Sequence, residues 1–409
     1  MKKICLYFQV HQPFRLRNYK VFEIGHNSDY FDHQKNKEVM EKVARKCYVP
    51  TNKHLLDLIK RHKGKFKVAF SITGTAIEQF EKYAPEVLDL FKELADTGCV
   101  EFLSETYYHS LAFIYSKEEF KEQVEMHRKK MKELFNQEPR IFRNTELIFN
   151  NELANYIEGL GYEGILAEGA DHILDWRSPN YVYKSKTTDK LKLLLKNYKL
   201  SDDVAFRFSQ HTWKDHPLTV EKYVRWMKES PGEIINLFMD YETFGEHQWD
   251  VTGIFQFLDK FPEEAIKNEM EFVNPSNLLD HEIKDELDVH SFMSWADVER
   301  DLSAWLGNKI QKSAIEELYK LERKVKETND PKLLDDWRKM NTSDHFYYMC
   351  TKFFNDGDVH KYFNPYETPY EAFIAFMNIL NDITHRIKGQ INGVEPKFSI
   401  SETPSAIFN

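Results

Sequence analysis

"EIINLFMDYETFGEHQW", residues 233 to 249, is the stretch that decides the fold. Its first part, residues 233–240, is short, apolar and β-branched, which predicts a buried β-strand. The strand ends in polar residues, because Asp240, Glu242 and His247 follow in quick succession. In extended geometry residues i and i+2 point to the same side, so Asp240 and Glu242 are expected to share one space. Such an ending is typical of a strand that leads into a functional site.

Further runs of the same kind recur along the first 275 residues or so. They are 3–10, 67–73, 100–105, 140–146, 164–168 and 204–209. Between them lie segments with apolar residues at helical spacing, at 52–62, 86–98, 116–135, 150–161 and 219–230. This alternation predicts parallel strands in an α/β fold. The strand number favours a (β/α)7 barrel, a distorted relative of the TIM barrel, over an open sheet, and places the site at the C-terminal strand ends.

The character of the sequence changes after about residue 290, where long helical patterns replace the alternation. We therefore expect a catalytic barrel over residues 1–290 and a C-terminal helical bundle over residues 291–409. No Gly/Ser-rich linker separates the two parts, which indicates that they are tightly joined.

Composition argues against several classes of function. The net charge of −10 argues against nucleic acid as a partner. No stretch reaches the roughly 18 apolar residues of a membrane span. Gln9 and His11 interrupt the apolar start, which favours a first strand over a signal peptide. The four cysteines are far apart and form no C-x-x-C, which favours reduced thiols and a cytoplasmic location.

Asp240, Glu242 and Glu146 are the acids that could carry chemistry. Two carboxylates in one space repel, so the pKa of at least one should rise. A carboxylic acid of raised pKa is what a glycosidase needs to protonate a leaving oxygen. The alternative is that one acid pairs with a lysine or arginine. Glu146 ends another predicted strand beside Arg143 and Asn144, which could orient it, although an isolated Glu there can also be a solvated loop residue.

His11, His109 and His247 each follow a predicted strand, and Gln12 is adjacent to the first of them. Imidazole and amide groups both donate and accept, which suits sugar hydroxyls, whereas a lone histidine is often structural. The high aromatic content of 14% fits either a thick core or sugar-stacking surfaces. No H-x-x-x-H, H-E-x-x-H, phosphate-loop or nucleophile-elbow pattern occurs, so no metal ion or cofactor is predicted.

With these residues assembled, the chain resembles glycoside hydrolase family 57, and within it the α-amylase-like branch. The resemblance rests on motifs in order: "HQP" at 11–13, "GTAIE" at 74–78, "RNTEL" at 143–147, "DYETFGEHQ" at 240–248 and "DLSAWLGN" at 301–308. The stretch "KLSDDVAFRFS" at 199–209 is also similar to that branch.

The resemblance implies a seven-stranded barrel followed by a helical bundle, no metal, and retention of anomeric configuration. It implies Glu146 as the nucleophile, Asp240 as the general acid/base and an α-1,4-glucan (starch, glycogen or a maltooligosaccharide) as the substrate of an α-amylase. The candidate substrate-binding residues are His11, Gln12, Glu78, His109, Trp213, Glu242, His247 and Trp249. Trp295 is a further stacking candidate, with packing between barrel and bundle as the alternative for Trp295 and Trp305.

The third motif departs from the family pattern. Many relatives have an aromatic or apolar lead such as "WLPE", whereas this chain has "FRNTE" at 142–146. Arg143 and Asn144 would alter the surroundings of Glu146, which affects subsite detail rather than the identity of the nucleophile.

Three other functions stay open from the sequence. A 4-α-glucanotransferase would use the same residues but admit a sugar hydroxyl in place of water. A non-catalytic glucan-binding protein would bind maltooligosaccharides without turnover. A metal-dependent deacetylase on a related barrel would need one Asp and two His ligands. The sequence predicts no oligomeric state.

Overall fold

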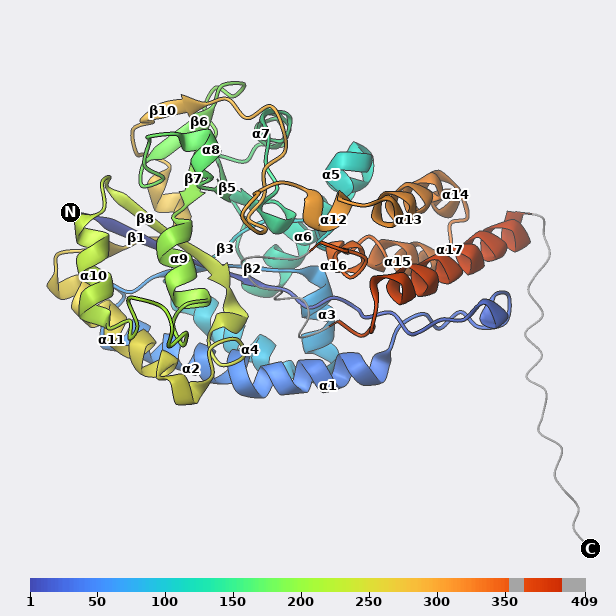
Figure 1. The fold of residues 1–409 in the computed structure, drawn as a ribbon, viewed down its shortest axis with the longest axis horizontal. Coiled ribbons are helices and arrows are strands. Elements are labelled where there is room, and N and C mark those ends of the chain that lie inside the picture. Colours follow the sequence, from blue (N-terminus) through green and yellow to red (C-terminus); the bar gives the residue numbers. More distant parts are fainter. Residues whose placement is uncertain (353–363, 392–409) are drawn as a thin grey trace, which may run out of the picture.

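A computed structural model describes residues 1–352 and 364–391 of the chain. Its first sheet has the strand order β3-β2-β1-β8, with β9 also paired to β1. These strands are β1 (Lys3–Val10), β2 (Val68–Ile72), β3 (Val100–Phe102), β8 (Ile234–Asp240) and β9 (Glu271–Phe272). All their pairings are parallel. The apolar runs at 3–10 and 233–240 therefore form neighbouring parallel strands of one sheet (Figure 1).

The second sheet has the order β10-β6-β7-β5-β4. Its strands are β4 (Ile141–Arg143), β5 (Gly164–Glu168), β6 (Val182–Ser185), β7 (Lys192–Lys196) and β10 (Asp285–Leu287). The pairings are parallel except for the antiparallel pair β6–β7. The chain thus has the predicted α/β fold, with parallel pairing of the described strands everywhere except between β6 and β7.

The two sheets meet at two places. An isolated parallel bridge joins Ser104, just after β3, to Phe142 of β4. On the other side, the Asn197 N–H donates to the Asn236 carbonyl at 2.9 Å, and the Asn236 side-chain amide donates to the Leu195 carbonyl at 2.8 Å. Asn236, a buried residue of β8, therefore links the two sheets at a place where β7 and β8 are not paired as strands.

Helices cover the outer faces of the strands. In chain order they are α1 (His33–Val43), α2 (Val49–Arg61), α3 (Gly74–Tyr83), α4 (Pro85–Asp96), α5 (Ala112–Tyr115), α6 (Lys117–Phe135), α7 (Asn151–Gly159), α8 (Asp171–Leu174), α9 (Tyr198–Ala205), α10 (Val220–Glu229) and α11 (Ile254–Lys267). Helix α6 begins as its sequence predicts, because Ser116 Oγ accepts from the Glu119 N–H at 3.1 Å.

One predicted strand, 204–209, is wrong. Residues 198–205 form helix α9, and turns follow. The Asn197 side chain caps this helix by accepting from the Leu200 N–H at 3.1 Å, and Leu200 and Val204 are buried at helical spacing. The real strands β6 and β7 lie just before this helix; they are short and contain lysines, which hides them from a search for apolar runs.

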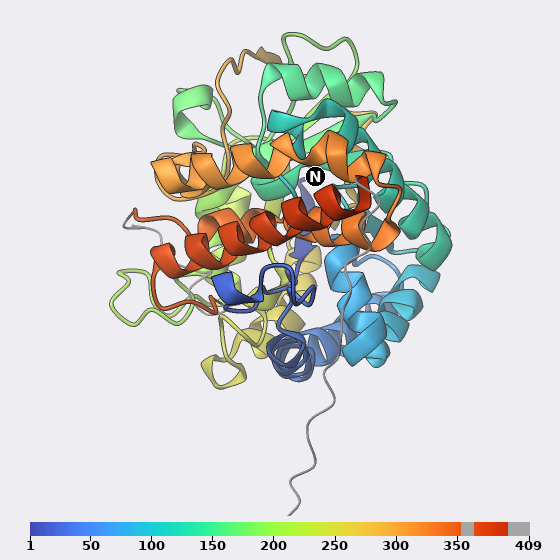
Figure 2. The same cartoon turned by 90° about the vertical axis from the view of Figure 1, so that its right-hand side faces the viewer.

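The C-terminal part is helical over its described residues. It comprises α12 (Ser303–Leu306), α13 (Lys309–Lys320), α14 (Glu322–Glu327), α15 (Pro331–Lys339), α16 (Ser343–Tyr347) and α17 (Pro369–Ile391). These helices gather at one end of the molecule, and Figure 2 shows α17 crossing beside the N-terminal segment. Their core includes Phe14, Leu16, Tyr19, Tyr30 and Phe31, so an N-terminal excursion is packed into it.

Among the described helices, none is both long enough and apolar enough to cross a membrane.

Candidate active site

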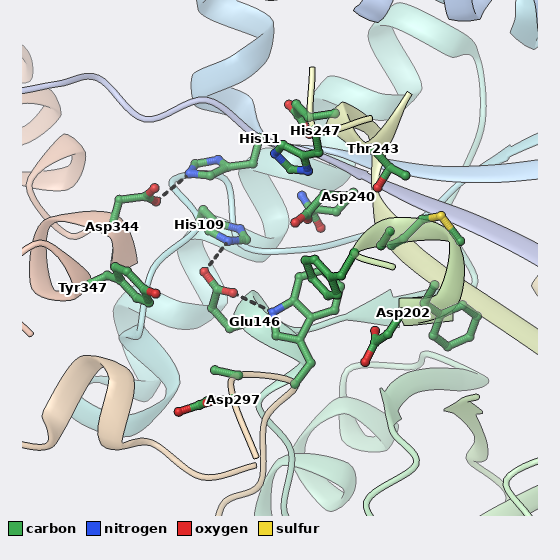
Figure 3. A pocket seen from close by; sticks show the side chains of 18 of the residues that line it. His11, His109, Glu146, Asp202, Asp240, Thr243, His247, Asp297, Asp344 and Tyr347 are labelled. Atoms are coloured by element: carbon green, nitrogen blue, oxygen red, sulfur yellow. Dashed lines mark hydrogen bonds and ion pairs between the residues drawn. The ribbon is translucent and has the colours of Figure 1, made fainter. Parts of the chain in front are cut away.

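A pocket opens where β1 and β8 end, and segments from both sheets and from the helical part line it (Figure 3). Its volume is about 140 Å³. The lining includes Gln9, His11, Gln12, His109, Glu146, Lys196, Asp202, Asp240, Glu242, His247, Trp295, Arg300, Trp305, Asp344 and Tyr347. The pocket therefore lies at the carboxyl strand ends, as predicted for a parallel α/β fold.

Glu146 is held from several sides. Its carboxylate accepts from the Trp295 indole N–H at 2.8 Å through Oε2, and from Ser343 Oγ at 3.2 Å through Oε1. His109 Nε2 lies 3.3 Å from the same Oε1. The chain leaves β4 in a sharp turn, in which Glu146 and Leu147 have φ values of 58° and 51°. Left-handed backbone is uncommon outside glycine, so the surrounding contacts fix this carboxylate in a costly conformation.

His109 connects Glu146 to a second buried acid, Glu105. Its Nδ1 lies 3.1 Å from Glu105 Oε2. Burial alone would lower the pKa of His109, but the hydrogen bonds to Glu105 and Glu146 raise it to about 9. Burial opposes ionisation of Glu105, yet the His109 contact lowers its pKa to about 2. At neutral pH His109 is therefore an imidazolium between two carboxylates.

His11 stacks on His109, with ring centroids 4.0 Å apart and an interplanar angle of 23°. Its Nδ1 lies 3.0 Å from Thr73 Oγ1 and its Nε2 lies 2.8 Å from Asp344 Oδ2. Burial and the charge of His109 lower the pKa of His11, against the opposing pull of Asp344. The two stacked rings therefore differ in charge at neutral pH, which makes one a cationic and the other a neutral hydrogen-bonding group.

Asp240 and Glu242 both line the pocket, as their spacing predicts. Asp240 ends β8 opposite Gln9 of β1, and Glu242 follows in a short 3₁₀ turn. Glu242 accepts from the Tyr48 hydroxyl and, at 3.4 Å, from the Gln12 amide. Burial and the charge of Asp240 raise the pKa of Glu242 to about 8. The carboxyl group with the raised pKa is thus Glu242.

The turn after Glu242 depends on Gly245, whose φ is +102°. A Cβ at this position would lie 2.0 Å from the Lys46 carbonyl oxygen, so only glycine fits there. The turn brings His247 into the lining of the pocket. The requirement for glycine at position 245 therefore explains the glycine in the sequence "FGEH" at residues 244–247.

The sequence did not identify several lining residues. Asp344 and Tyr347 come from α16, and Lys196, Asp202 and Arg300 come from β7, α9 and the segment before α12. Lys196 Nζ lies 3.0 Å from Asp202 Oδ1. No local pattern marks Asp344 and Tyr347, because long-range packing of the helical part brings α16 to the pocket, whereas Asp202 lies within the stretch 199–209 quoted from the sequence.

Trp295 lines the pocket and bonds to Glu146, rather than only packing between the sheets and the helices. Trp305 is buried, lines the same pocket, and also belongs to the core of the helical part. The packing alternative therefore fits Trp305 better than Trp295.

Glu78, predicted to bind substrate, is not among the lining residues. It lies on α3 and accepts from the Tyr107 hydroxyl at 3.1 Å, while Lys339 Nζ lies 3.0 Å from its other oxygen. These contacts tie α3 to α15. The prediction of direct sugar contact by Glu78 in this pocket is not supported, because the carboxylate serves a link between helices.

Trp213 and Trp249 also lie outside the lining. Trp213 is half-buried and meets Trp226 edge-to-face, with ring centroids 6.1 Å apart. Trp249 is 56% exposed, and Lys46 Nζ lies 5.6 Å from its ring centroid. Neither ring contacts the pocket, so their predicted role in stacking a sugar there is not supported.

Among the described residues, no group of three or more His, Cys, Asp and Glu side chains has a geometry that could hold a metal ion.

Comparison with known proteins gives consistent matches. Residues 5–292 match the model of glycosyl hydrolase family 57. A relative from Methanocaldococcus jannaschii, named "Putative alpha-amylase", is 47% identical over 403 residues, which cover 94% of this chain and 85% of that one.

Solved structures share the fold at low identity. A family 57 branching enzyme from Thermococcus kodakaraensis has a TM-score of 0.67 at 13% identity, covering 98% of this chain and 97% of that one. A 4-α-glucanotransferase from Thermococcus litoralis has a TM-score of 0.61 at 16% identity, covering 84% of this chain and 56% of that one. The chain therefore spans little more than half the length of that glucanotransferase.

Proposed function

Because this chain belongs to glycosyl hydrolase family 57, we propose that it is a retaining α-1,4-glucan hydrolase of the α-amylase type. Its substrates would be starch, glycogen and maltooligosaccharides. The relative named as an α-amylase, at 47% identity over almost the whole chain, supports this substrate class.

One observation carries the mechanism. Glu146 and Asp240 line the same pocket, and three donors converge on the Glu146 carboxylate. Hydrogen bonds to the charged form stabilise an ionised carboxylate, which is the state a nucleophile needs. Asp240 stands at a strand end beside a second acid, Glu242, where a proton can be exchanged with a sugar oxygen.

In the proposed reaction, Asp240 and Glu242 share one proton, and Asp240 gives it to the glycosidic oxygen while Glu146 attacks the anomeric carbon. The bond to the leaving sugar breaks and a glycosyl-enzyme ester forms. Asp240, now ionised, takes a proton from water, which attacks the same carbon and releases Glu146 as a carboxylate. Retention requires the two carboxyl groups to lie roughly 5 to 6 Å apart in the substrate complex, whereas about 9 Å would favour inversion.

The sugar at the cleavage point would be held by His11, Gln12, His109, Glu242 and His247. All five line the pocket. A cationic His109, a neutral His11 and a protonated Glu242 present different donors and acceptors, which suits the several hydroxyls of one glucose unit.

We further propose that β8, β1, β2, β3, β4, β5 and β7 act together as one (β/α)7 barrel, with the helical bundle of residues 291–409 as a second unit behind a catalytic unit of residues 1–290. The bridge at Ser104 and the hydrogen bonds of Asn236 support a ring of strands. A cytoplasmic location is proposed from the sequence alone.

The test is a chromatogram of maltoheptaose after incubation with the protein, beside a Glu146→Ala control. Only shorter sugars with rising reducing ends are expected, because water takes the glycosyl group. The Glu146→Ala sample should keep the maltoheptaose peak.

Other product patterns would overturn the proposal in distinct ways. Longer and shorter sugars at constant reducing ends would mean transfer, the reaction of a 4-α-glucanotransferase. An unchanged peak with wild-type protein, together with binding of maltoheptaose in calorimetry, would mean a glucan-binding protein without turnover.

A further inference from the structure

Arg143, the last residue of β4, is fully buried three residues before Glu146. None of its three guanidinium nitrogens has a hydrogen-bond partner among the described residues. A buried charge without such partners destabilises the folded chain, so an apolar side chain would serve a purely structural position better. The proposed reaction gives this arginine no role so far.

The charges around Glu146 explain why a cation is useful there. His109 contributes one positive charge, and it lies between the carboxylates of Glu105 and Glu146. A further cation near this cluster favours the ionised form of both carboxylates. Arg143 acts on the same cluster, because its charge is one of the causes that lower the pKa of Glu105.

Trp295 links Arg143 to Glu146. The Arg143 guanidinium carbon lies 4.8 Å from the centroid of the Trp295 ring, within the range of a cation–π contact. The Trp295 indole N–H donates to Glu146 Oε2. The Trp295 backbone N–H donates to the Glu146 backbone carbonyl at 3.2 Å. Lys196 also approaches the ring, at 5.3 Å, but it is paired with Asp202. Arg143 is thus the cation on this ring with no hydrogen-bonded partner among the described residues.

We propose that Arg143 is a positioning residue for the reaction: its buried guanidinium adds positive charge beside the Glu105–His109–Glu146 cluster and holds Trp295 against the Glu146 carboxylate. A cation on the face of an indole also strengthens its N–H as a donor, because it draws electron density from the ring. This role rests on the proposed function, since it concerns the same nucleophile.

The test uses Arg143→Met, which removes the charge but fills a similar space, and Arg143→Lys, which keeps the charge. The substrates are maltoheptaose and an α-maltosyl fluoride. Arg143→Met should lower kcat/KM about 100-fold on both, because a misplaced nucleophile slows attack whatever the leaving group. Arg143→Lys should recover at least about tenfold of that loss.

A second variant tests the route through Trp295. Trp295→Phe keeps an aromatic ring but loses the N–H, and it should lower kcat/KM to a similar degree. The double variant Arg143→Met/Trp295→Phe should be little worse than either single variant, because both changes break one chain of contacts. Losses that multiply would overturn this route.

The pH profile separates a positioning role from a structural one. The acid limb of kcat/KM reports the essential base of the free enzyme. Without the Arg143 charge this limb should move to higher pH by about one unit, and Arg143→Lys should leave it in place. The other charged or titratable groups at the site are unchanged in every variant; they include Glu105, His109, His11, Asp344, Asp240, Glu242, His247, Asp202, Asp297, Lys196, Arg15 and Arg300.

Trp337→Phe is the matched control. It also removes a buried indole N–H bond, here to the Leu318 carbonyl at 2.9 Å within the helical part. It should lower Tm and leave kcat/KM within about twofold of wild type. The inference fails if Arg143→Met keeps the wild-type kcat/KM and acid limb, or if its loss follows Tm as in the control. An inactive wild-type protein would instead count against the proposed function.

Discussion

Two segments of the pocket, residues 143–146 and residues 239–242, begin alike and end differently. Each follows a parallel strand, and each brings an acid to the pocket. After β4 the chain turns through left-handed backbone at Glu146, whose carboxylate meets an imidazolium, an indole and a hydroxyl. After β8 the chain continues through Asp240 in extended conformation, and Glu242 accepts from the neutral side chains of Tyr48 and Gln12.

The difference shows how one fold gives two buried carboxyl groups, Glu146 and Glu242, opposite charge states. Donors and a nearby cation favour the ionised form of a carboxylate, whereas burial beside another acid favours the protonated form. In the first segment, the Glu146 carboxylate accepts hydrogen bonds from donors on three separate parts of the chain. The second relies on burial and on the charge of Asp240, which together raise the pKa of Glu242 to about 8.

The sharpest way to break this comparison is to remove the acid of the first segment. Glu146→Ala should lower kcat on maltoheptaose by about 10⁴-fold or more, because no other group in the pocket can form the glycosyl-enzyme. With α-maltosyl fluoride and added azide, the variant should yield β-maltosyl azide, since azide then attacks from the side that Glu146 occupied. An α-azide product from this variant would assign the nucleophile elsewhere.

Removing the acid of the second segment should have a smaller effect that depends on the substrate. Asp240→Ala should lower kcat/KM on maltoheptaose roughly 10²- to 10⁴-fold, because the leaving sugar needs a proton. The loss on α-maltosyl fluoride should be far smaller, since fluoride leaves without a general acid. With azide this variant should give the α-azide. Equal losses on both substrates would mean that Asp240 does not act as the acid.

The same two segments indicate how far sequence reasoning reaches. Strands β1 and β8 were predicted within a residue because their mainly apolar runs are long. Residues 204–209 were predicted as a strand but belong to a helix and turns. The Asn197 side chain caps helix α9, and this stabilises the helix more than the short aromatic run favours a strand. Strands β6 and β7 were missed because each is short and carries lysine.

For the site, the sequence identified the residues that sit directly at strand ends. His11, His109, Glu146, Asp240, Glu242 and His247 were all predicted, and all line one pocket. Their partners were not identified. Asp344 and Ser343 lie about 200 residues further along than Glu146, on a helix whose own pattern gives no indication of a pocket. Glu78 matched a motif, but its side chain turns to another helix.

The charge state of the second segment can be tested through stability. Glu242 has a pKa of about 8 in the folded chain and about 4.3 when unfolded, so the folded state binds its proton more tightly. The resulting stabilisation is fully present below about pH 4 and is lost as pH rises through 8. Glu242→Gln, which imitates the protonated form, should not lose it.

Between pH 5 and pH 8.5 the Tm of Glu242→Gln should therefore rise relative to wild type by roughly 10 °C, since about three pH units at about 1.4 kcal/mol each amount to about 4 kcal/mol, and about 1 kcal/mol moves Tm by roughly 2 to 4 °C in a large domain. The measurement is thermal unfolding followed by circular dichroism at several pH values. His109, with its pKa raised to about 9, also makes both proteins less stable toward alkaline pH, but it is common to both and cancels in the difference. A Tm difference that does not vary with pH would mean that Glu242 is already ionised in the folded protein at pH 5.

The smallest effects are expected where residues matched the pattern of a site but lie outside the pocket. Glu78→Gln and Trp249→Phe should each change kcat/KM on maltoheptaose less than about threefold, because neither side chain lines the pocket. Glu78→Gln should still lower Tm, since Lys339 loses an ion pair that joins α3 to α15. Trp249→Phe should leave Tm unchanged, because its ring is 56% exposed.

His247→Ala is the contrasting variant. His247 is two residues from Trp249 but lines the pocket, so this change should raise KM for maltoheptaose. A tenfold loss in Trp249→Phe, confined to sugars longer than maltotriose, would mean that the binding site extends beyond the pocket and along the turn that Gly245 permits.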